Sequence, residues 1–459
     1  MTVRRFPLRY QVQEMPAPGT VTGHAGLALV LEAFRAWGLR TAAARAFPFK
    51  QRRRGYSEAH CLETLVAMLA AGADCVDDVR VLAADAGLLQ LWEQEQLPAA
   101  ETLRTFLRRF HDPVAEAARV PHTAYIPAPT PALAGFAAVQ QQLLGAVQER
   151  VQCPSATLDV DATVIHCAKQ AALPVYDKEG VGYQPLGVWW SEMGLWVRSQ
   201  FRDGNVPAQT GILPLLQESV AALRALGVTE IAVRSDSAGY QHGVLRYLRR
   251  AGIPFAISAD LSPELRATLE TIPESAWGPV YPDRDGELLR EWAEVAYVPN
   301  DPAATRTEPP DRYLIERVRP SRQLPLFADG AAFHSYAVVT NRWDLAGAAV
   351  LRWAHARCGS IEPAHDVLKN ECGGGVLPSR HFGVNAAWWQ CVVLTANLLR
   401  ALTGLTLPGR WERARPKRLR FLLLSLAARV IRHGRVLWLR LPRGHPGTAI
   451  FAAARAALL

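Results

Sequence analysis

The sequence predicts an α/β protein centred on a mixed sheet with the element order β-β-β-α-β-α-β. Thr157–Ile165 reads as a short apolar strand, and the apolar runs 186–190 and 195–201 flank a turn, as in a hairpin. Helices and apolar strands then alternate, at 212–226, 231–236, 240–251 and 254–257. We therefore expect an antiparallel meander that ends in a βαβ crossover.

This order of elements is that of a ribonuclease-H-like fold, and the chain before it is expected to be helical. Amphipathic or apolar helices are predicted at 26–39, 58–71 and 97–110. The proline-rich run 126–131 marks the end of this helical region.

The pattern loosens after the crossover. Residues 261–335 contain many prolines and short apolar runs, which predicts a β-rich insertion. Clear helical patterns return at 345–355, around 362–369 and at 382–402, and a basic segment, expected to be helical, closes the chain. The mixed sheet is thus expected to be interrupted rather than continuous in sequence.

Four acidic residues stand out. Asp159 and Asp161 share one face of the first strand because side chains alternate along a strand. Like charges so close favour a bound cation or a proton, although one Asp capping the next turn while the other is solvated is also possible. Asp236 ends a second apolar strand, where open α/β sheets place their chemistry. Glu362 lies in a later helix.

Charge is concentrated near the end of the chain. The net charge is +9, and residues 408–446 hold eleven basic side chains against Glu412 alone. Such a balance favours an acidic polymer as partner, and arginine suits bidentate phosphate contacts, although a GC-rich genome gives the same arginine bias. Arg104, Arg108 and Arg109 form a second basic group on a short helix, as a phosphate-binding or merely solvated face.

Cysteine usage and hydropathy predict a cytoplasmic protein. The seven cysteines are scattered without zinc-site spacing, and the first residues lack the apolar core of a signal peptide. The most apolar helix, 382–402, carries Asn385, Gln390, Thr395 and Asn397, so we expect a buried core helix and no membrane contact.

A resemblance to a known family follows from an ordered set of motifs. The chain resembles bacterial insertion-sequence transposases of the DDE type, specifically insertion-sequence family thirteen-eighty, which is similar to the eukaryotic piggyBac group. The motifs are Asp159-x-Asp161-x-Thr163, Tyr183–Leu186, Arg202–Asn205, Arg234–Ser237, Ser379–Asn385 and Ala427–Arg435.

The resemblance implies that Asp161, Asp236 and Glu362 hold two Mg²⁺ ions, for which Mn²⁺ can substitute, with Asp159 as an outer or substitute ligand. It implies double-stranded DNA as partner, both terminal inverted repeats and target, and a homodimer that joins two ends. The expected DNA contacts are Arg104, Arg108, Arg109, Arg357, Lys369, Arg415, Lys417, Arg418, Arg420, Arg432 and Arg435.

The chain then divides into five regions. We expect a helical DNA-binding and dimerisation domain (1–145), a catalytic core in two parts (146–260 and 336–405) around the β-rich insertion (261–335), and a basic C-terminal DNA-binding segment (406–459).

The third motif departs from the family pattern. The family places Arg four residues before the Glu, but Cys358 occupies that position and Arg357 is one residue early; His355 replaces the preceding tyrosine. Lys369 lies at the expected distance, and Pro363 predicts that Glu362 lies in the first turn of its helix. A transposase-derived protein that binds DNA without cutting it is therefore an alternative.

A second alternative arises from the first strand. Asp159-x-Asp161-x-Thr163 also fits the signature of haloacid-dehalogenase-like phosphatases, in which Asp159 is the nucleophile and Asp161 the general acid. Its position far from the N-terminus and the lack of a downstream acidic pair count against this interpretation.

Overall fold

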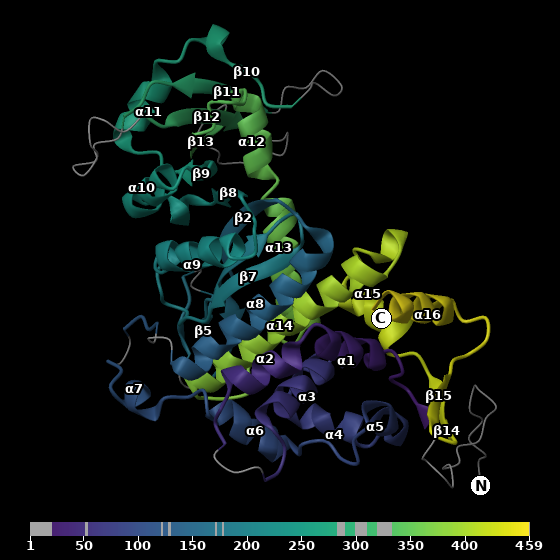
Figure 1. Ribbon diagram of the computed structural model, residues 1–459. Helices are drawn as coiled ribbons and strands as arrows, with labels where there is room; N and C mark the ends of the chain where they lie inside the picture. Colours follow the sequence, from purple (N-terminus) through teal and green to yellow (C-terminus); the bar gives the residue numbers. More distant parts are fainter. Residues whose placement is uncertain are drawn as a thin grey trace, which may run out of the picture.

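A computed structural model describes residues 21–50, 54–120, 123–126, 130–169, 172–176, 179–281, 290–298, 310–318 and 333–458. Figure 1 shows helices of the first third at the base, a large sheet above them, and a separate corner built by the end of the chain. Residues 127–129 of the proline-rich run lie outside the described residues.

The first third is helical, as the sequence predicts. Glycines and capping residues set the helix ends: Ser57 accepts a hydrogen bond from the His60 backbone N–H, and Gly72, with a φ of +105°, ends the same helix. The helices are α1 (Leu27–Ala36), α2 (Leu39–Ala46), α3 (Glu58–Ala71), α4 (Val79–Ala83), α5 (Ala86–Trp92), α6 (Ala100–Arg108), α7 (Pro113–Ala117) and α8 (Pro131–Val151).

A nine-stranded mixed sheet forms the centre of the molecule. Its order is β10-β11-β12-β13-β9-β8-β2-β6-β7, in which β2 pairs in parallel with β8 and antiparallel with β6. The strands are β2 (Ser155–Ala162), β6 (Leu186–Trp190), β7 (Leu195–Gln200), β8 (Glu230–Ser235), β9 (Phe255–Ala259), β10 (Gly278–Pro279), β11 (Arg290–Val295), β12 (Arg312–Val318) and β13 (His334–Thr340).

The predicted element order is present, with α9 (Ile212–Arg224) and α10 (His242–Arg250) as the two helices. One difference from the prediction lies between the first two of these strands. A small sheet of β3 (Ile165–His166), β4 (Leu173–Pro174) and β5 (Val181–Tyr183) intervenes between β2 and β6.

The predicted insertion also contributes to the main sheet instead of standing apart from it. β13 begins at the end of this segment, lies mostly in the predicted second part of the core, and pairs antiparallel with β9. β12 of the insertion pairs with β13, and β11 and β10 extend the sheet from there. The same segment contains the helix α11 (Pro263–Glu270).

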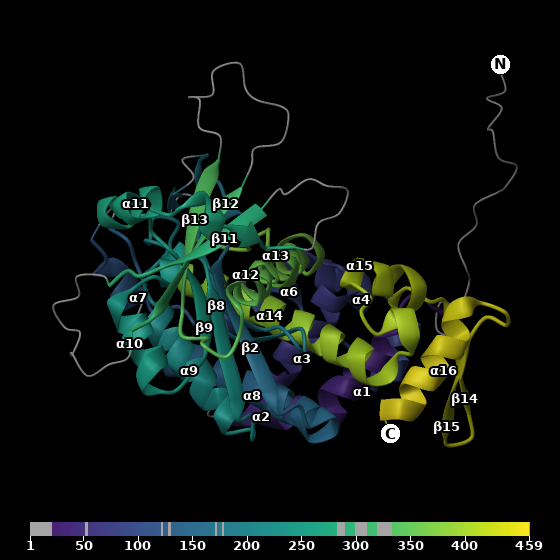
Figure 2. The ribbon, with the colours of Figure 1, turned by 90° about the horizontal axis from the view of Figure 1, so that it is seen from above.

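The later helices return to the sheet and to the first helices. They are α12 (Gly347–His355), α13 (Cys358–Asp366), α14 (Phe382–Thr406), α15 (Pro416–Leu419) and α16 (Pro446–Leu458). In Figures 1 and 2, α14 runs between the first helices and the sheet. It is a buried core helix, as predicted, and Asn397 pairs with the backbone of Trp196 in β7. Of the described helices, no single one is long and apolar enough to cross a membrane, although α3 with the bent segment 76–83 passes that test as a pair.

The prediction of a wholly helical C-terminal segment is wrong. Residues 428–440 form a hairpin of β14 (Ala428–His433) and β15 (Val436–Arg440), and β14 also pairs with β1 (Val21–Thr22). Gly434 has a φ of +61° at the first position of the two-residue turn, where hairpins favour glycine. Short apolar runs on both sides of this glycine, Val430–Ile431 and Val436–Leu439, are the signal for the hairpin.

Candidate active site

Asp161 lies near the end of β2, an inner strand of the sheet that has β8 and β6 as its neighbours. Its side chain is 18% exposed, and its Oδ1 accepts a hydrogen bond of 2.9 Å from the Ala162 backbone N–H. Its Oδ2 lies 3.4 Å from Nη1 of Arg357 and 4.0 Å from Nε2 of His365. A carboxylate on a mostly buried strand therefore faces the start of α13.

The other two predicted acids approach Asp161 from separate elements. Asp236 follows β8, the parallel neighbour of β2, and its carboxylate caps the next turn by accepting from the Ala238 N–H. Glu362 lies on α13, which packs against β2. Three segments distant in sequence therefore bring carboxylates to one region.

The pKa of Asp161 shows that these charges interact. Burial raises it from 3.8 to about 6, the guanidinium of Arg357 opposes the rise, and the negative charges of Asp236 and Glu362 add to it. Acids that repel one another in this way favour a cation among them.

A polar cleft of about 350 Å³ opens beside two of the acids. Asp161 and Asp236 both line it, together with Asp260, which follows β9. In the part of the chain that the structure describes, the three predicted acids are not among the groups whose ligand atoms all lie within 4.8 Å of one another.

Another group of possible ligands, Asp74, Cys75 and Asp78, does have its ligand atoms within 4.8 Å of one another. Its geometry has another explanation, because Oδ2 of Asp78 accepts from the backbone N–H groups of Asp74 and Cys75 and caps a short helical turn.

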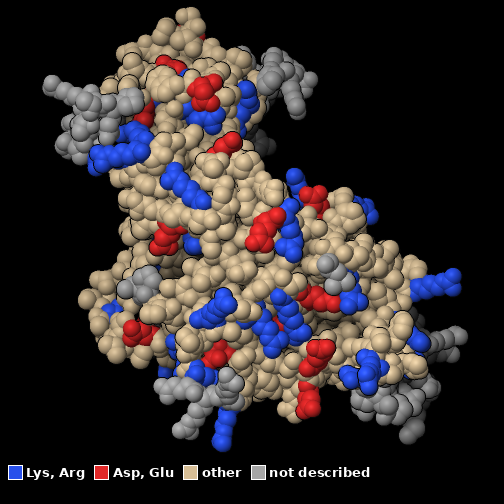
Figure 3. Space-filling view, in the orientation of Figure 1, with Lys and Arg blue, Asp and Glu red and all other residues tan. Residues whose placement is uncertain are grey.

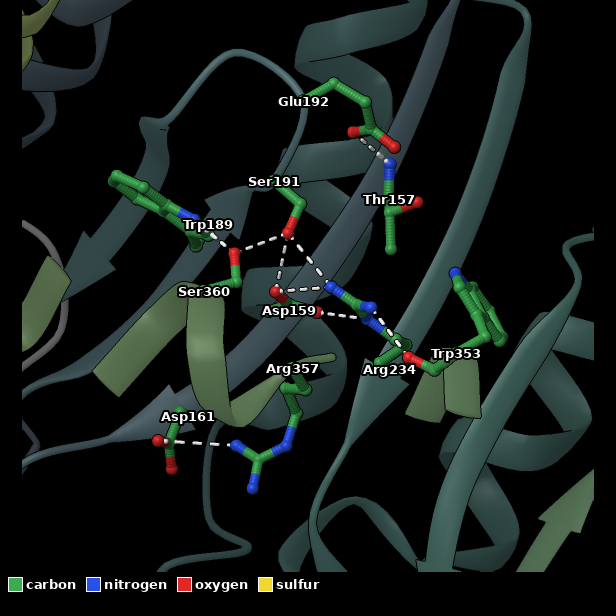
Figure 4. A network of polar contacts seen from close by, with 10 residues as sticks. All are labelled: Thr157, Asp159, Asp161, Trp189, Ser191, Glu192, Arg234, Trp353, Arg357 and Ser360. Atoms are coloured by element: carbon green, nitrogen blue, oxygen red, sulfur yellow. Dashed lines mark hydrogen bonds and ion pairs between the residues drawn. The ribbon is translucent and has the colours of Figure 1, made fainter. Parts of the chain in front are cut away.

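Asp159 has a structural role instead of the predicted role as a ligand. It is fully buried, and its two oxygens accept from Nε and Nη2 of Arg234 at 2.6 and 2.8 Å (Figure 4). The Ser191 hydroxyl donates a third hydrogen bond of 2.8 Å. With both oxygens satisfied and no route from solvent, Asp159 is neither an open metal ligand nor the nucleophile of a phosphatase.

The Asp159 ion pair is the centre of a network that attaches α13 to the sheet (Figure 4). Ser191 contacts Ser360 of α13 at 2.5 Å, and Nη1 of Arg234 donates to the Trp353 carbonyl of α12 at 2.7 Å. The network therefore fixes the helix that carries Glu362 relative to the strand that carries Asp161.

Sequence reasoning placed Arg234 in a motif but did not give it this role. The relevant signal is the parallel register, which places Arg234 directly beside Asp159 on the neighbouring strand. Because the register comes only with the fold, the pairing was not deducible from spacing.

Arg357 lies near Asp161. In the sequence it is one residue before the position, occupied here by Cys358, at which the family pattern has Arg. The side chain of Arg357 is 13% exposed and points to Asp161, so in this structure it partly neutralises an acid (Figure 4). Lys369 donates to the Val164 carbonyl at 3.4 Å, just beyond the end of β2. Both predicted DNA contacts thus border the acids.

His365 lies on the same helix, one turn after Glu362. It is buried against the Trp196 ring, with centroids 4.8 Å apart, and burial lowers its pKa to about 3. Neither ring nitrogen has a hydrogen-bond partner in the structure. No pattern in the sequence assigns this histidine a function.

The position predicted for Glu362 within its helix is wrong. α13 begins at Cys358, so Glu362 lies inside the helix and Pro363 follows it there. Pro363 removes one N–H donor from the interior of α13, and the helix continues into a π-helical stretch at 367–371.

The predicted basic residues fall into two groups. Some have partners within the protein: Arg104 pairs with Asp77, Arg108 with Glu101, and Arg415 with Asp366 and Glu371. Those with exposed side chains and no carboxylate partner among the described residues are Arg109, Lys417, Arg418, Arg432 and Arg435.

The prediction that Arg420 contacts DNA is not supported. Its guanidinium donates to the carbonyls of Leu69 and Ala70 at the end of α3, at 2.9 and 2.7 Å. It satisfies carbonyls that the helix leaves open. Figure 3 shows basic and acidic side chains interspersed over one face, with no continuous basic surface there.

Comparison with known proteins identifies the family of this chain from its sequence. The family described as transposase DDE domain group 1 matches residues 9–459. No curated protein matches the chain. The chain is similar in structure to a piggyBac transposase in a synaptic complex with hairpin DNA, with 12% sequence identity, a TM-score of 0.42, and coverage of 87% of this chain and 79% of that one.

Proposed function

Because the chain belongs to the DDE transposase family, we propose that it cleaves and joins DNA strands by two-metal-ion phosphoryl transfer at Asp161, Asp236 and Glu362. We further place it with the insertion-sequence family thirteen-eighty, in the bacterial cytoplasm, acting as a homodimer on terminal inverted repeats and target DNA. A ribonuclease-H-like core is the fold that this reaction would use.

The observation that carries the proposal is the electrostatic coupling of the three acids. Burial and the charges of Asp236 and Glu362 together raise the pKa of Asp161, and a cleft opens beside Asp161 and Asp236. The donor set is all carboxylate oxygen, which Mg²⁺ prefers and Mn²⁺ accepts. These residues therefore fit two divalent ions.

The ions supply an activated water or 3′-hydroxyl and stabilise the leaving oxygen of the phosphate. The residues of the chain do the rest. Asp161, Asp236 and Glu362 would hold the ions, and the Asp159–Arg234 pair keeps α13 in register with β2. With the charge of Asp161 compensated in the loaded site, Arg357 would be free to contact a DNA phosphate beside the cut.

The exposed basic residues near the end of the chain are proposed to bind phosphates away from the cut. Lys417 and Arg418 are exposed, and the Arg418 guanidinium lies 5.2 Å from the centroid of the Trp411 ring and 5.7 Å from that of Phe421. Neutralising Lys417 and Arg418 should flatten the dependence of DNA affinity on salt by ~0.9 for each phosphate that the protein no longer neutralises.

The test is strand cleavage on a plasmid that carries the DNA flanking the coding sequence on both sides. We expect nicking or excision in Mg²⁺ or Mn²⁺, and its loss in Asp161→Asn and Glu362→Gln with DNA binding retained. Asp366→Asn is the matched control, because Asp366 lies on the same helix but pairs with Arg415.

Cleavage that survives both substitutions would remove the catalytic assignment. Tight binding without cleavage by the unaltered protein would favour a transposase-derived DNA-binding protein, which the altered motif before Glu362 keeps as the second candidate.

A further inference from the structure

The hairpin of β14 and β15 has an outward face of unusual composition. Directly paired residues on that face are Arg429 with Arg440, Ile431 with Trp438, and His433 with Val436. The other face packs inward through Val430, which is fully buried, and Leu439. We refer to residues 428–440 as the ribbon.

The outward face combines exposed apolar and basic side chains. Trp438 is 56% exposed and Val436 55%. Exposed aromatic and aliphatic side chains beside arginines mark an interaction surface rather than an ordinary solvated face. No Asp or Glu occurs after Glu412 in the sequence, so no acid of the C-terminal segment itself balances this charge.

Two arginines lie directly opposite each other on the ribbon. Like charges in such a cross-strand pair oppose strand association. For Arg429 and Arg440 no carboxylate lies within 4.0 Å among the described residues, and their side chains are exposed. An anion bound between them would remove this repulsion.

The ribbon is held firmly at its base. β1 pairs with β14 on one side, and α16 leads the chain back to the body, where Arg455 pairs with Glu32 of α1 at 3.0 Å. Figures 1 and 2 show the ribbon projecting at the edge of the molecule, away from β2 and α13. A partner that contacts both the ribbon and the three acids of the candidate active site must therefore be long enough to extend from one to the other.

We propose that the ribbon enters a groove of double-stranded DNA, with Arg429, Arg440 and Arg435 on phosphates and Trp438 against the groove wall. The major groove, about 12 Å wide, admits a two-stranded ribbon. The ribbon thereby holds DNA that flanks the cut, outside the reacting centre. The choice of DNA as partner rests on the function proposed above.

The shape of the tip distinguishes DNA from a lipid surface. The turn is Gly434-Arg435 and follows His433, the last residue of β14, so the most distant point is polar and basic. A hairpin that inserts into a bilayer would need apolar residues there. A groove lined on both sides by phosphates suits a charged tip and a basic margin.

The test measures binding of the full chain to a mixed-sequence duplex by fluorescence anisotropy over a series of salt concentrations. Arg429→Gln/Arg440→Gln should lower the slope of log affinity against log salt by ~2, from ~0.9 per neutralised phosphate. The matched control is Arg45→Gln/Arg224→Gln, which removes two exposed arginines from α2 and α9 and should leave the slope unchanged.

Trp438→Ala should lower affinity several-fold at an unchanged slope, because an apolar contact releases no counterions. Trp438→Phe should restore most of that affinity. Circular dichroism should stay at the wild-type values in all variants, and the urea midpoint should not fall in any of them, since each side chain is exposed.

Three outcomes would overturn the proposal. They are an unaltered salt slope in Arg429→Gln/Arg440→Gln, a change in the control pair as large as the change in that variant, and an unaltered affinity in Trp438→Ala. So would binding to anionic vesicles that duplex DNA fails to displace. Plasmid cleavage separates the two proposals: normal cleavage with no ribbon effect refutes the ribbon alone, and ribbon-dependent binding without cleavage refutes the catalytic function alone.

Discussion

Removing the charge of Asp161 should stabilise the metal-free protein. The carboxylate is mostly buried, and its pKa rises from 3.8 to about 6 because burial and two neighbouring acids disfavour its ionised form more than Arg357 favours it. At neutral pH the folded protein therefore carries a penalty that Asp161→Asn removes while keeping the shape of the side chain.

The size of that penalty follows from the shift. A rise from 3.8 to about 6 is about two pKa units, and at 1.36 kcal/mol each it corresponds to ~3 kcal/mol of unfolding free energy. Because the folded-state pKa lies above the unfolded value, the penalty is complete above pH 6, shrinks as the pH falls from 6 to 3.8, and is absent below that.

Urea denaturation with EDTA, at pH 7.5 and pH 4.5, measures this effect. Asp161→Asn should be more stable than wild type by about 1 to 3 kcal/mol at pH 7.5, and the difference should shrink at pH 4.5. Adding Mn²⁺ should stabilise wild type but not the variant, because binding to the folded state alone raises stability. A less stable variant at pH 7.5 in EDTA would show that the acids do not repel one another, and the reasoning would fail.

Three further outcomes follow from the same contacts. Arg234→Met should lower stability in urea by ~3 to 5 kcal/mol, because Asp159 is left buried without its partner, and Arg234→Lys should rescue little of it; a decrease under about 1 kcal/mol would contradict the ion-pair account. Arg420→Gln should cost ~1 to 3 kcal/mol by removing two hydrogen bonds yet leave the salt dependence of DNA binding unchanged, whereas a flattened dependence would restore its role at DNA. Mn²⁺ affinity, followed by titration calorimetry, should fall as the pH drops through 6 and Asp161 takes up a proton; a flat profile from pH 7.5 to 5 would place the ion elsewhere.

Much of the central sheet was predictable because its strands are short, apolar and bounded by glycines or turns. The same patterns place Asp161 and Asp236 at strand ends, and the parallel pairing of β2 and β8 brings those ends together. Local sequence patterns do not predict which strands pair with one another, and therefore do not predict which strands belong to the same sheet. The strands of residues 261–335 look like a separate unit in sequence, and only the pairing of β12 with β13, which itself pairs with β9, makes them part of one sheet.

The role of Asp159 shows the limit most clearly. On the strand it shares a face with Asp161, so spacing alone assigns both to one site. Burial and the register with Arg234 divide them, giving one a structural ion pair and leaving the other beside the cleft. The number of basic residues is an equally poor guide to the role of Arg420. A basic run in the sequence does not show which of its side chains will donate hydrogen bonds to carbonyls at the end of a helix.

The central claim is that Asp161, Asp236 and Glu362 are ligands of the same pair of ions. Anomalous scattering from a crystal soaked in Mn²⁺ addresses it directly. The account predicts peaks beside the Asp161 carboxylate that Asp236 and Glu362 also reach, with Asp159 still paired to Arg234. Manganese bound only elsewhere, or an Asp161 carboxylate that keeps Arg357 and gains no ion at saturating Mn²⁺, would contradict it.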